Sequence, residues 1–219
     1  MEDKTKMEIE HVLPMDIESR SFEIITEELK EMGIELPKDQ AAITKRCIHT
    51  SADFDYAKNL VFSEDAIERA REAIKNGASI VTDTQMARSG INKKKLNNFG
   101  GQVYCFMSDE DVAARAKING TTRAVASMEK ACELEEKLIF AIGNAPTALI
   151  HLYELIQAGR IKPELVIGVP VGFVNVVPAK ELIMTQKEVP YIVARGRKGG
   201  SNIAACICNA LIYGIEQKR

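Results

Sequence analysis

The sequence predicts an α/β protein in which residues 1–219 form one three-layer α/β/α domain. Its central sheet is expected to have five strands and to be mostly parallel. Two observations predict this fold class. From residue 79 onward, short apolar runs alternate with helical segments, and each run is followed at once by polar or glycine-containing residues. Because parallel strands need crossover connections that cover both faces of the sheet, this alternation is typical of a sheet between two helical layers.

The first part of the chain is expected to be helical. Residues 1–15 read as a loose arm that ends near Pro14, and 16–32 as an amphipathic helix with Gly33 just past its end. A shorter helix over 39–47 delivers His49 at its C-terminal end. A further helix over 65–75 has acidic residues in its first turn and Gly77 after its last.

The regular part supplies the sheet. The five expected strands are 79–82, 102–106, 137–142, 165–168 and 191–194. The helical segments between and after them are 93–98, 110–118, 123–134, 147–158, 179–187 and 202–214. No repeat, low-complexity tract or linker divides the chain, so one domain is expected.

Composition narrows the class of protein. Apolar residues make up 46% of the chain and charged residues 27%, as in an ordinary globular protein. No apolar run reaches the roughly 18 residues of a membrane span, and the polar N-terminus does not resemble a secretory signal. A cytoplasmic protein is therefore expected. The net charge of −2 predicts no nucleic-acid partner, and five scattered cysteines predict reduced thiols and no metal cluster.

Polar segments follow every expected strand. In open parallel sheets, ligands bind outside the carboxyl ends of the strands, so all of these segments are expected to line one rim. The segments are 83–86, 108–109, 143–146, 169–173 and 195–201. The sequence therefore predicts a broad cleft along this edge.

His49 is the candidate for proton chemistry. A histidine changes its charge near neutral pH, with an unperturbed pKa of about 6.5. Thr50, Ser51, Asp53 or Asp55 could fix its tautomer, as general acid or base catalysis requires. The alternative is a polar turn in which His49 is simply hydrogen-bonded.

A basic, glycine-rich segment over 195–201 predicts an anion site. Arg195, Arg197 and Lys198 supply positive charge, and small residues allow backbone N–H groups to approach an anion at the start of the last helix. The segment is not a nucleotide-binding motif, so its anion is either a phosphate or a carboxylate. The alternative is a solvated basic turn. Arg123 adds a cation at a helix start, where the helix dipole disfavours it, and so is expected to meet an anion.

Six runs together resemble the precorrin-8X methylmutase family, including the cobalt-precorrin-8 form of the pathway. They extend through most of the chain in order and at family-like intervals. The runs are IHTSADFDYA (48–57), GASIVTDTQMARSGI (77–91), TTRAVA (121–126), IGNAPTAL (142–149), IGVPVGFVN (167–175) and GRKGGSNIAACICNAL (196–211).

The resemblance implies an isomerase that moves a methyl group from C-11 to C-12 of a corrin precursor, giving hydrogenobyrinate or its cobalt counterpart, cobyrinate. It also implies a flavodoxin-like sheet, a homodimer and no added cofactor. The family's catalytic histidine falls on His49, which would protonate a ring nitrogen as the methyl group migrates. Whether the natural substrate carries cobalt is left open by the sequence.

The substrate implied is a flat macrocycle fringed with carboxylates, which fits a rim of arginines and glycines. The expected contacts to it are carboxylate pairing, contacts to the ring edge or plane, backbone contacts, and closure of the cleft by the first helix. The residues are, in that order, Arg123, Arg195, Arg197 and Lys198; Thr84, Gln85 and Met86; Gly199, Gly200 and Ser201; and Ser19, Arg20 and Ser21.

The chain departs from the family pattern at one place. Where the family carries Glu-Ser-Lys, this sequence has Pro178, Ala179 and Lys180, which is expected to remove polar groups from the rim. Two other functions therefore stay open at this stage. One is a non-catalytic tetrapyrrole-binding or carrier protein, and the other is an enzyme that acts on a phosphorylated metabolite through the segment 195–201.

Overall fold

The computed structural model describes residues 10–216. The chain divides into two compact units, 1–35 and 36–219, and each is described by itself. In the first unit, α1 (Ile17–Glu31) carries Arg20, whose guanidinium pairs with Glu10 at 2.9 Å and with Glu23 at 3.4 Å. The expected organisation of the whole chain as one domain stays a prediction.

The second unit contains a six-stranded sheet in the order β1-β6-β5-β4-β2-β3. Every neighbouring pair is parallel except β1 with β6, which is antiparallel. The strands are β1 (Leu60–Phe62), β2 (Ser79–Thr82), β3 (Val103–Tyr104), β4 (Leu138–Ile142), β5 (Leu165–Gly168) and β6 (Tyr191–Ala194). Their side chains are nearly all buried, as expected for a sheet covered on both faces.

The parallel part confirms the expected α/β class. Counted along the chain, its five strands lie in the order 2-1-3-4-5, which is the flavodoxin-like arrangement. The sheet has one strand more than the five that the sequence predicts, because β1 joins the edge beside β6. That strand has only three residues and pairs antiparallel with β6, and it lies before the regular alternation that begins at residue 79, so no local sequence pattern indicates it.

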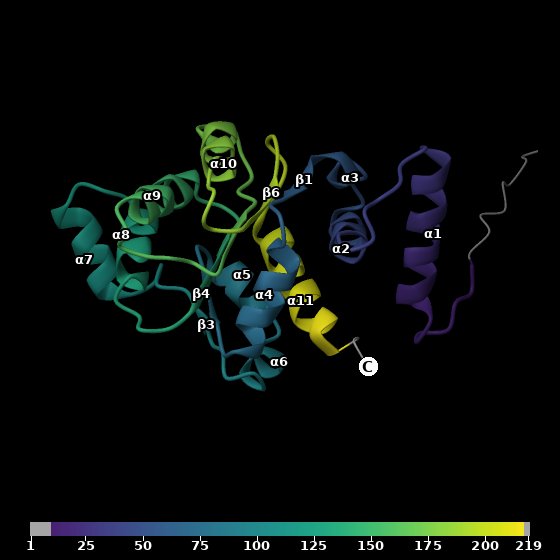
Figure 1. Cartoon of the computed structure of the whole chain (residues 1–219), viewed down its shortest axis with the longest axis horizontal. Coiled ribbons are helices and arrows are strands. Elements are labelled where there is room, and N and C mark those ends of the chain that lie inside the picture. The colour runs from purple at the N-terminus through teal and green to yellow at the C-terminus, as the bar shows by residue number, and fades with distance from the viewer. Residues whose placement is uncertain (1–9, 217–219) are drawn as a thin grey trace, which may run out of the picture. The chain divides into compact units, whose positions relative to one another are not determined.

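Helices cover both faces of the sheet, with α8, α9 and α10 on one side and α4, α5 and α11 on the other (Figure 1). The first layer contains α7 (Glu110–Ile118), α8 (Arg123–Ala131), α9 (Pro146–Gln157) and α10 (Val176–Met184). The second contains α2 (Ala41–Ser51), α4 (Ala66–Lys75), α5 (Gln85–Gly90), α6 (Lys93–Asn97) and α11 (Ser201–Glu216), with the short α3 (Tyr56–Asn59) leading into β1.

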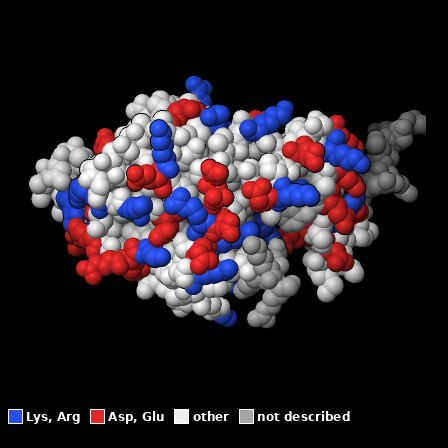
Figure 2. Space-filling view, in the orientation of Figure 1, with Lys and Arg blue, Asp and Glu red and all other residues white. Residues whose placement is uncertain are grey.

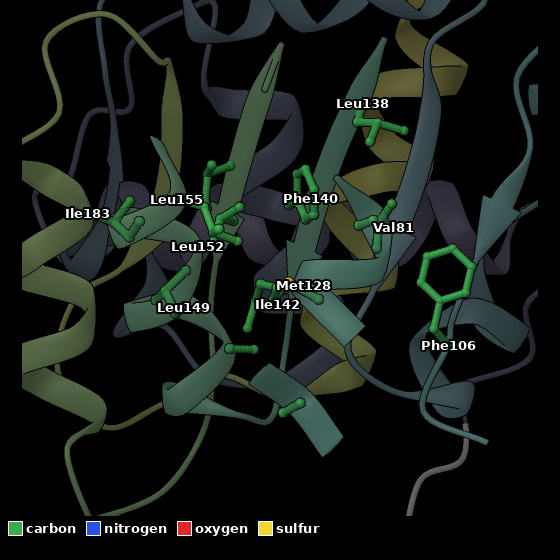
Figure 3. Close-up of a cluster of buried hydrophobic side chains, with 14 of the residues drawn as sticks. Val81, Phe106, Met128, Leu138, Phe140, Ile142, Leu149, Leu152, Leu155 and Ile183 are labelled. Atoms are coloured by element: carbon green, nitrogen blue, oxygen red, sulfur yellow. The ribbon is translucent and has the colours of Figure 1, made fainter. Parts of the chain in front are cut away.

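An apolar core joins the sheet to the first layer. Phe140 of β4 is fully buried and packs in one cluster with Leu149 and Leu152 of α9 and Met128 of α8. Figure 3 shows these side chains together with Val81 of the neighbouring strand. Each fully buried aliphatic or aromatic side chain of this kind contributes about 1.5–3 kcal/mol relative to exposure, so the cluster fixes the strands whose ends form the rim.

Two helices near the rim differ in extent from the prediction. The helix expected over 39–47 continues to Ser51, because Ile48 extends its buried face, and it stops where Ala52 adopts a left-handed conformation. The helix expected over 179–187 begins earlier, at Val176, after a left-handed Asn175. Pro178 therefore lies in the first turn, where a missing N–H removes no helical hydrogen bond.

No helix in the described residues is both long enough and apolar enough to cross a membrane.

Candidate functional site

Asp83 connects the loop after β2 to the loop after β4. These two neighbouring strands form the switch point of the sheet, because the chain continues from β2 to β3 on one side and then returns to β4 on the other. Its side chain is 1% exposed, and its carboxylate accepts hydrogen bonds from the backbone N–H groups of Gly143 (2.8 Å), Asn144 (2.8 Å) and Ala145 (2.6 Å). Burial raises the pKa of Asp83 above its ordinary value, while these three N–H groups act against the rise. The carboxylate thus fixes the loop at the switch point, where α/β proteins of this kind bind ligands.

The start of α11 packs against the same place. Thr84 caps α5 by accepting a hydrogen bond from Ala87, and its hydroxyl lies 2.8 Å from that of Ser201. A Cβ on Gly143 would lie only 2.8 Å from the carbonyl oxygen of Gly200, so the two backbones touch and leave no room for a side chain. Thr84, Gly200 and Ser201, all predicted site residues, are therefore neighbours.

The loops after β5 and β6 are joined to each other. The N–H of Gly200 donates to Val169 at 2.9 Å, and the N–H of Gly172 donates to Arg197 at 3.2 Å. A Cβ on Gly199 would overlap the carbonyl group of Val169, so this contact also requires glycine. Together with Asp83, these bonds join the loops after β2, β4, β5 and β6 into one edge.

Lys180 holds the loop after β6 from beneath. Its side chain is 0% exposed, and its ammonium group donates to the carbonyl oxygens of Gly196 and Lys198, each at 2.8 Å. Burial lowers the pKa of Lys180 to about 8. These two hydrogen bonds fix the backbone of the loop that carries the cations Arg195, Arg197 and Lys198.

The three predicted cations of that loop have different surroundings. Lys198 pairs with Asp53 and Asp55, each at 2.6 Å, and these carboxylates raise the pKa of Lys198 above its ordinary value. Arg195 pairs with Glu181 at 3.1 Å. The guanidinium carbon of Arg197 lies 5.2 Å from the ring centroid of Phe173, within the range of a cation–π contact.

His49 lies in the last turn of α2, and its side chain is exposed. The four residues expected to orient it also make contacts elsewhere, and their role in orienting His49 stays a prediction. Thr50 donates to Cys206 at 3.2 Å and Ser51 to the carbonyl of Cys47 at 2.7 Å, while Asp53 and Asp55 pair with Lys198. Because the turn after α2 is ion-paired with Lys198, the end of the helix that carries His49 is attached to the basic loop.

The other predicted residues of this unit occupy the ends of neighbouring helices. Gln85 donates to the carbonyl of Cys105 and to the hydroxyl of Ser108, both at 3.3 Å, so it connects the loop after β3 to the rim. Met86 is 71% exposed. Arg123 is exposed at the first position of α8, next to Thr122, which caps that helix.

The remaining predicted residues belong to the first unit. The hydroxyls of Ser19 and Ser21 donate to the backbone carbonyls of Asp16 and Ile17, at 3.1 and 3.0 Å. Arg20 has the two glutamate partners given above. Their expected role in closing the cleft stays a prediction.

Exposed apolar side chains lie on the loop that follows β5. Phe173 is 79% exposed, Val174 80% and Val171 47%. Charged side chains of both signs are interspersed over the face shown in Figure 2. The rim thus combines apolar surface with cations, a mixture that suits a ligand with an apolar body and acidic substituents.

A separate cavity of about 490 Å³ lies at the opposite edge of the sheet. It is lined by α4, by Asp39 and by Gly214 near the end of α11, and it contains none of the predicted site residues. Within residues 10–216, no group of three or more His, Cys, Asp or Glu side chains could hold a metal ion.

The sequence analysis missed the role of Lys180 and misjudged the position of Ala179. Lys180 was noted only as the last of the three residues 178–180 that replace Glu-Ser-Lys. Its burial has no local signal, because a lysine in an amphipathic helix is normally solvated. Ala179 was expected to remove a polar group from the rim, and this was wrong. Its side chain is fully buried in the apolar core, and only Pro178 is exposed.

Comparison with known proteins gives a consistent result. The family model for precorrin-8X methylmutase matches residues 16–214. The chain is 44% identical over 211 residues to the cobalt-precorrin-8 methylmutase of Priestia megaterium, covering 96% of this chain and 92% of that protein. It is 38% identical to the precorrin-8X methylmutase of Pseudomonas aeruginosa over 193 residues, which are 88% of this chain and 91% of the relative.

A solved structure agrees in fold as well as in sequence. The crystal structure of precorrin-8X methylmutase from Thermus thermophilus superimposes with a TM-score of 0.82 at 38% identity, covering 92% of this chain and 98% of that one. The match of the family model to most of the chain and the identities above 30% lead to one conclusion: the chain belongs to the precorrin-8X methylmutase family.

Proposed function

We propose that this protein is the isomerase that moves a methyl group from C-11 to C-12 of precorrin-8 or its cobalt form, giving hydrogenobyrinate or cobyrinate in cobalamin biosynthesis. Membership of the family over residues 16–214 supports the reaction class. The two relatives described above are named for precorrin-8X and for cobalt-precorrin-8, so both forms are candidate substrates.

The rim at the switch point is the observation that carries the proposal. Four loops are joined by the Asp83 carboxylate, the Thr84–Ser201 contact and the backbone bonds of Gly200 and Gly172. A pre-organised edge of this kind suits a reaction in which the protein orients one flat substrate and moves one proton.

The reaction proposed is intramolecular. The bond from C-11 to the methyl carbon breaks, a bond from C-12 to the same carbon forms, and the electrons are redistributed within the macrocycle. No external oxidant, reductant or added cofactor is needed. His49 would donate a proton to a ring nitrogen as the methyl group migrates, and then recover it. Its exposure on the last turn of α2 leaves the imidazole accessible to a large substrate.

Binding is proposed to use the cations of the rim. Arg197 and Arg123 are exposed, and Lys198 and Arg195 would exchange their protein carboxylates for those of the substrate. Thr84, Gln85 and Met86 would meet the ring, and Gly199, Gly200 and Ser201 would supply backbone and hydroxyl contacts. Ser19, Arg20 and Ser21 would close the cleft.

Three broader features are proposed with this activity. The protein would act as a homodimer in the cytoplasm, with the chain forming one functional domain. The exposed Val171, Phe173 and Val174 beside the rim are consistent with burial by substrate or by a second copy. Sedimentation of the protein with and without the corrinoid product distinguishes these two occupants, since only the second requires a dimer.

The test is conversion of substrate by the wild-type protein. Precorrin-8 and cobalt-precorrin-8 are each mixed with the protein, the visible spectrum is followed, and the product is isolated to locate the migrated methyl group by NMR. We expect conversion of at least one form, with the methyl group on C-12. Tight binding without conversion of either form would identify a carrier. Inorganic phosphate serves as a control and is expected not to raise the melting temperature.

A further inference from the structure

Two cysteine thiols meet between α2 and α11. Cys47 on α2 is 0% exposed, and Cys206, on the helix α11 that packs directly against α2, is partly exposed. The hydroxyl of Thr50, one turn after Cys47, donates to the sulfur of Cys206 at 3.2 Å. The sulfur of Cys206 therefore lies against the face of α2 that carries Thr50 and, one turn earlier, Cys47.

These contacts favour the thiolate form of Cys206. The neighbouring Cys47 thiol lowers the pKa of Cys206 below its ordinary value, with further lowering by Thr50 and by the charge of Arg46, while burial opposes the change. The interaction with Cys206, together with burial, raises the pKa of Cys47. Cys208 and Tyr56 are the other titratable groups that interact with Cys206, and burial raises the pKa of each.

The remaining cysteines lack this environment. Burial raises the pKa of Cys105 and of Cys132. Cys208 is fully buried, and burial also raises its pKa. Of the five cysteines, which all lie in the part of the chain described, Cys206 alone combines partial exposure, a hydroxyl donor at 3.2 Å and a second cysteine on the adjoining face of the neighbouring helix.

We propose that Cys206 is an oxidant-reactive thiol and that Cys47 resolves it to a disulfide between α2 and α11. The oxidant is a hydroperoxide. The Cys206 thiolate attacks one peroxide oxygen, the O–O bond breaks, and the sulfur becomes a sulfenic acid as water forms. Cys47 then attacks that sulfur and displaces the second oxygen as water, so two thiols and one hydrogen peroxide give one disulfide and two waters.

The disulfide would connect the helix that carries His49 to the helix that begins at Ser201. Its S–S bond would be about 2.05 Å long, so the two sulfurs must move into bonding distance as it forms. Packing of α2 directly against α11 holds the two thiols in reach of each other. This thiol chemistry is independent of the methyl migration.

The experiment treats the full-length reduced protein with hydrogen peroxide, blocks the remaining thiols with iodoacetamide and maps peptides without reduction. We expect a peptide pair joined through Cys47 and Cys206, restored to free thiols by dithiothreitol. In Cys47→Ser, Cys206 should stop at a sulfenic acid that dimedone traps. In Cys206→Ser, thiol loss should slow on the order of tenfold, because burial raises the pKa of Cys105, Cys132 and Cys208 and so disfavours their thiolates.

Cys132→Ser is the matched control, since it removes another partly exposed thiol and should leave the joined peptide and its rate unchanged. Thr50→Val, which removes one hydrogen-bond donor to Cys206, should slow the oxidation. Oxidation of Cys132 before Cys206, or loss of wild-type thiols without the joined peptide, would overturn the proposal. An unchanged rate in Cys206→Ser would overturn it as well.

Discussion

The ammonium group of Lys180 lies 2.8 Å from the carbonyl oxygen of Lys198, so a buried lysine holds the backbone of an exposed one. A second bond of the same length reaches Gly196 in the same loop. Lys198 in turn reaches Asp53 and Asp55, just beyond the helix that carries His49. The position of the basic loop relative to His49 therefore depends on a side chain that does not itself reach the rim.

Replacement of Lys180 tests this dependence. Lys180→Met keeps the volume and removes both hydrogen bonds, which leaves two carbonyl oxygens without this donor. An unsatisfied buried acceptor costs about 1–3 kcal/mol, so we expect a lower free energy of unfolding in urea together with weaker binding of the corrinoid product. Lys187→Met, at an exposed lysine, is the control. Equal stability and equal affinity in the two variants would contradict the role of Lys180.

The pH dependence of stability gives an independent measure of the same group. Burial lowers the pKa of Lys180 to about 8 from 10.5, so between these values the unfolded chain binds more protons than the folded protein. The contribution of Lys180 to the free energy of unfolding therefore rises with pH through this window, by at most about 1.4 kcal/mol per unit. The rise should be absent from Lys180→Met. Parallel pH profiles of wild type and variant would exclude a lowered pKa.

Gly143 tests the contact between the loop after β4 and the start of α11. A Cβ there would lie 2.8 Å from the carbonyl oxygen of Gly200 and from the Cα of Ser201, so Gly143→Ala must separate the two segments. Overpacking of this kind costs about 1–3 kcal/mol. We expect reduced stability and reduced product affinity. Gly120→Ala, where an added Cβ meets nothing within 4 Å, should keep its affinity for the product.

Lys198 tests whether the cations of the rim bind carboxylates of the substrate. Lys198→Ala should weaken binding of the corrinoid product and reduce the salt dependence of that binding, because one ionic contact is lost. The double variant Asp53→Asn, Asp55→Asn keeps the lysine and removes its protein partners, and it should bind the product at least as tightly as wild type. Equal weakening of binding in both variants would contradict this role and would show that the ion pairs of Lys198 only stabilise the position of the loop.

The variant triplet can be separated into its rim and core positions. Pro178 is exposed in the first turn of α10, whereas Ala179 is fully buried. Pro178→Glu introduces near the rim the carboxylate that the family carries at this position, so we expect a change in the KM for the corrin precursor. Ala179→Ser adds a hydroxyl to the core and should alter stability with little change in KM. The reverse pattern of effects would show that the burial assignment is wrong.

The sheet could be predicted from the sequence because its signal is local. The expected strands 79–82, 165–168 and 191–194 coincide with β2, β5 and β6. The gathering of the loops at one edge of the sheet could also be predicted, because the carboxyl ends of parallel strands lie at the same edge. In contrast, β1 has three residues and depends on pairing with β6, which lies about 130 residues further along the chain.

The contacts of the site could not be predicted in the same way. Asp55, one of the two carboxylate partners of Lys198, lies 143 residues away in the sequence, and no pattern within the loop 195–201 indicates this pairing. A histidine, two hydroxyls and two carboxylates in one short segment suggested that they serve each other. The fold brings Thr50 to Cys206 and the carboxylates to Lys198, contacts with distant elements that the local pattern does not indicate, and their role in orienting His49 stays a prediction.

The most direct test of the account is single-turnover conversion by His49→Ala. Substrate is mixed with excess protein, and binding is measured on the same sample. We predict that the variant binds the corrin precursor about as well as wild type but converts it on the order of 10²-fold or more slowly, because general acid catalysis is lost. His151→Gln, at a histidine paired with Glu129 and Glu154, should convert at the wild-type rate. An unchanged rate in His49→Ala would contradict the account and remove His49 from the chemistry.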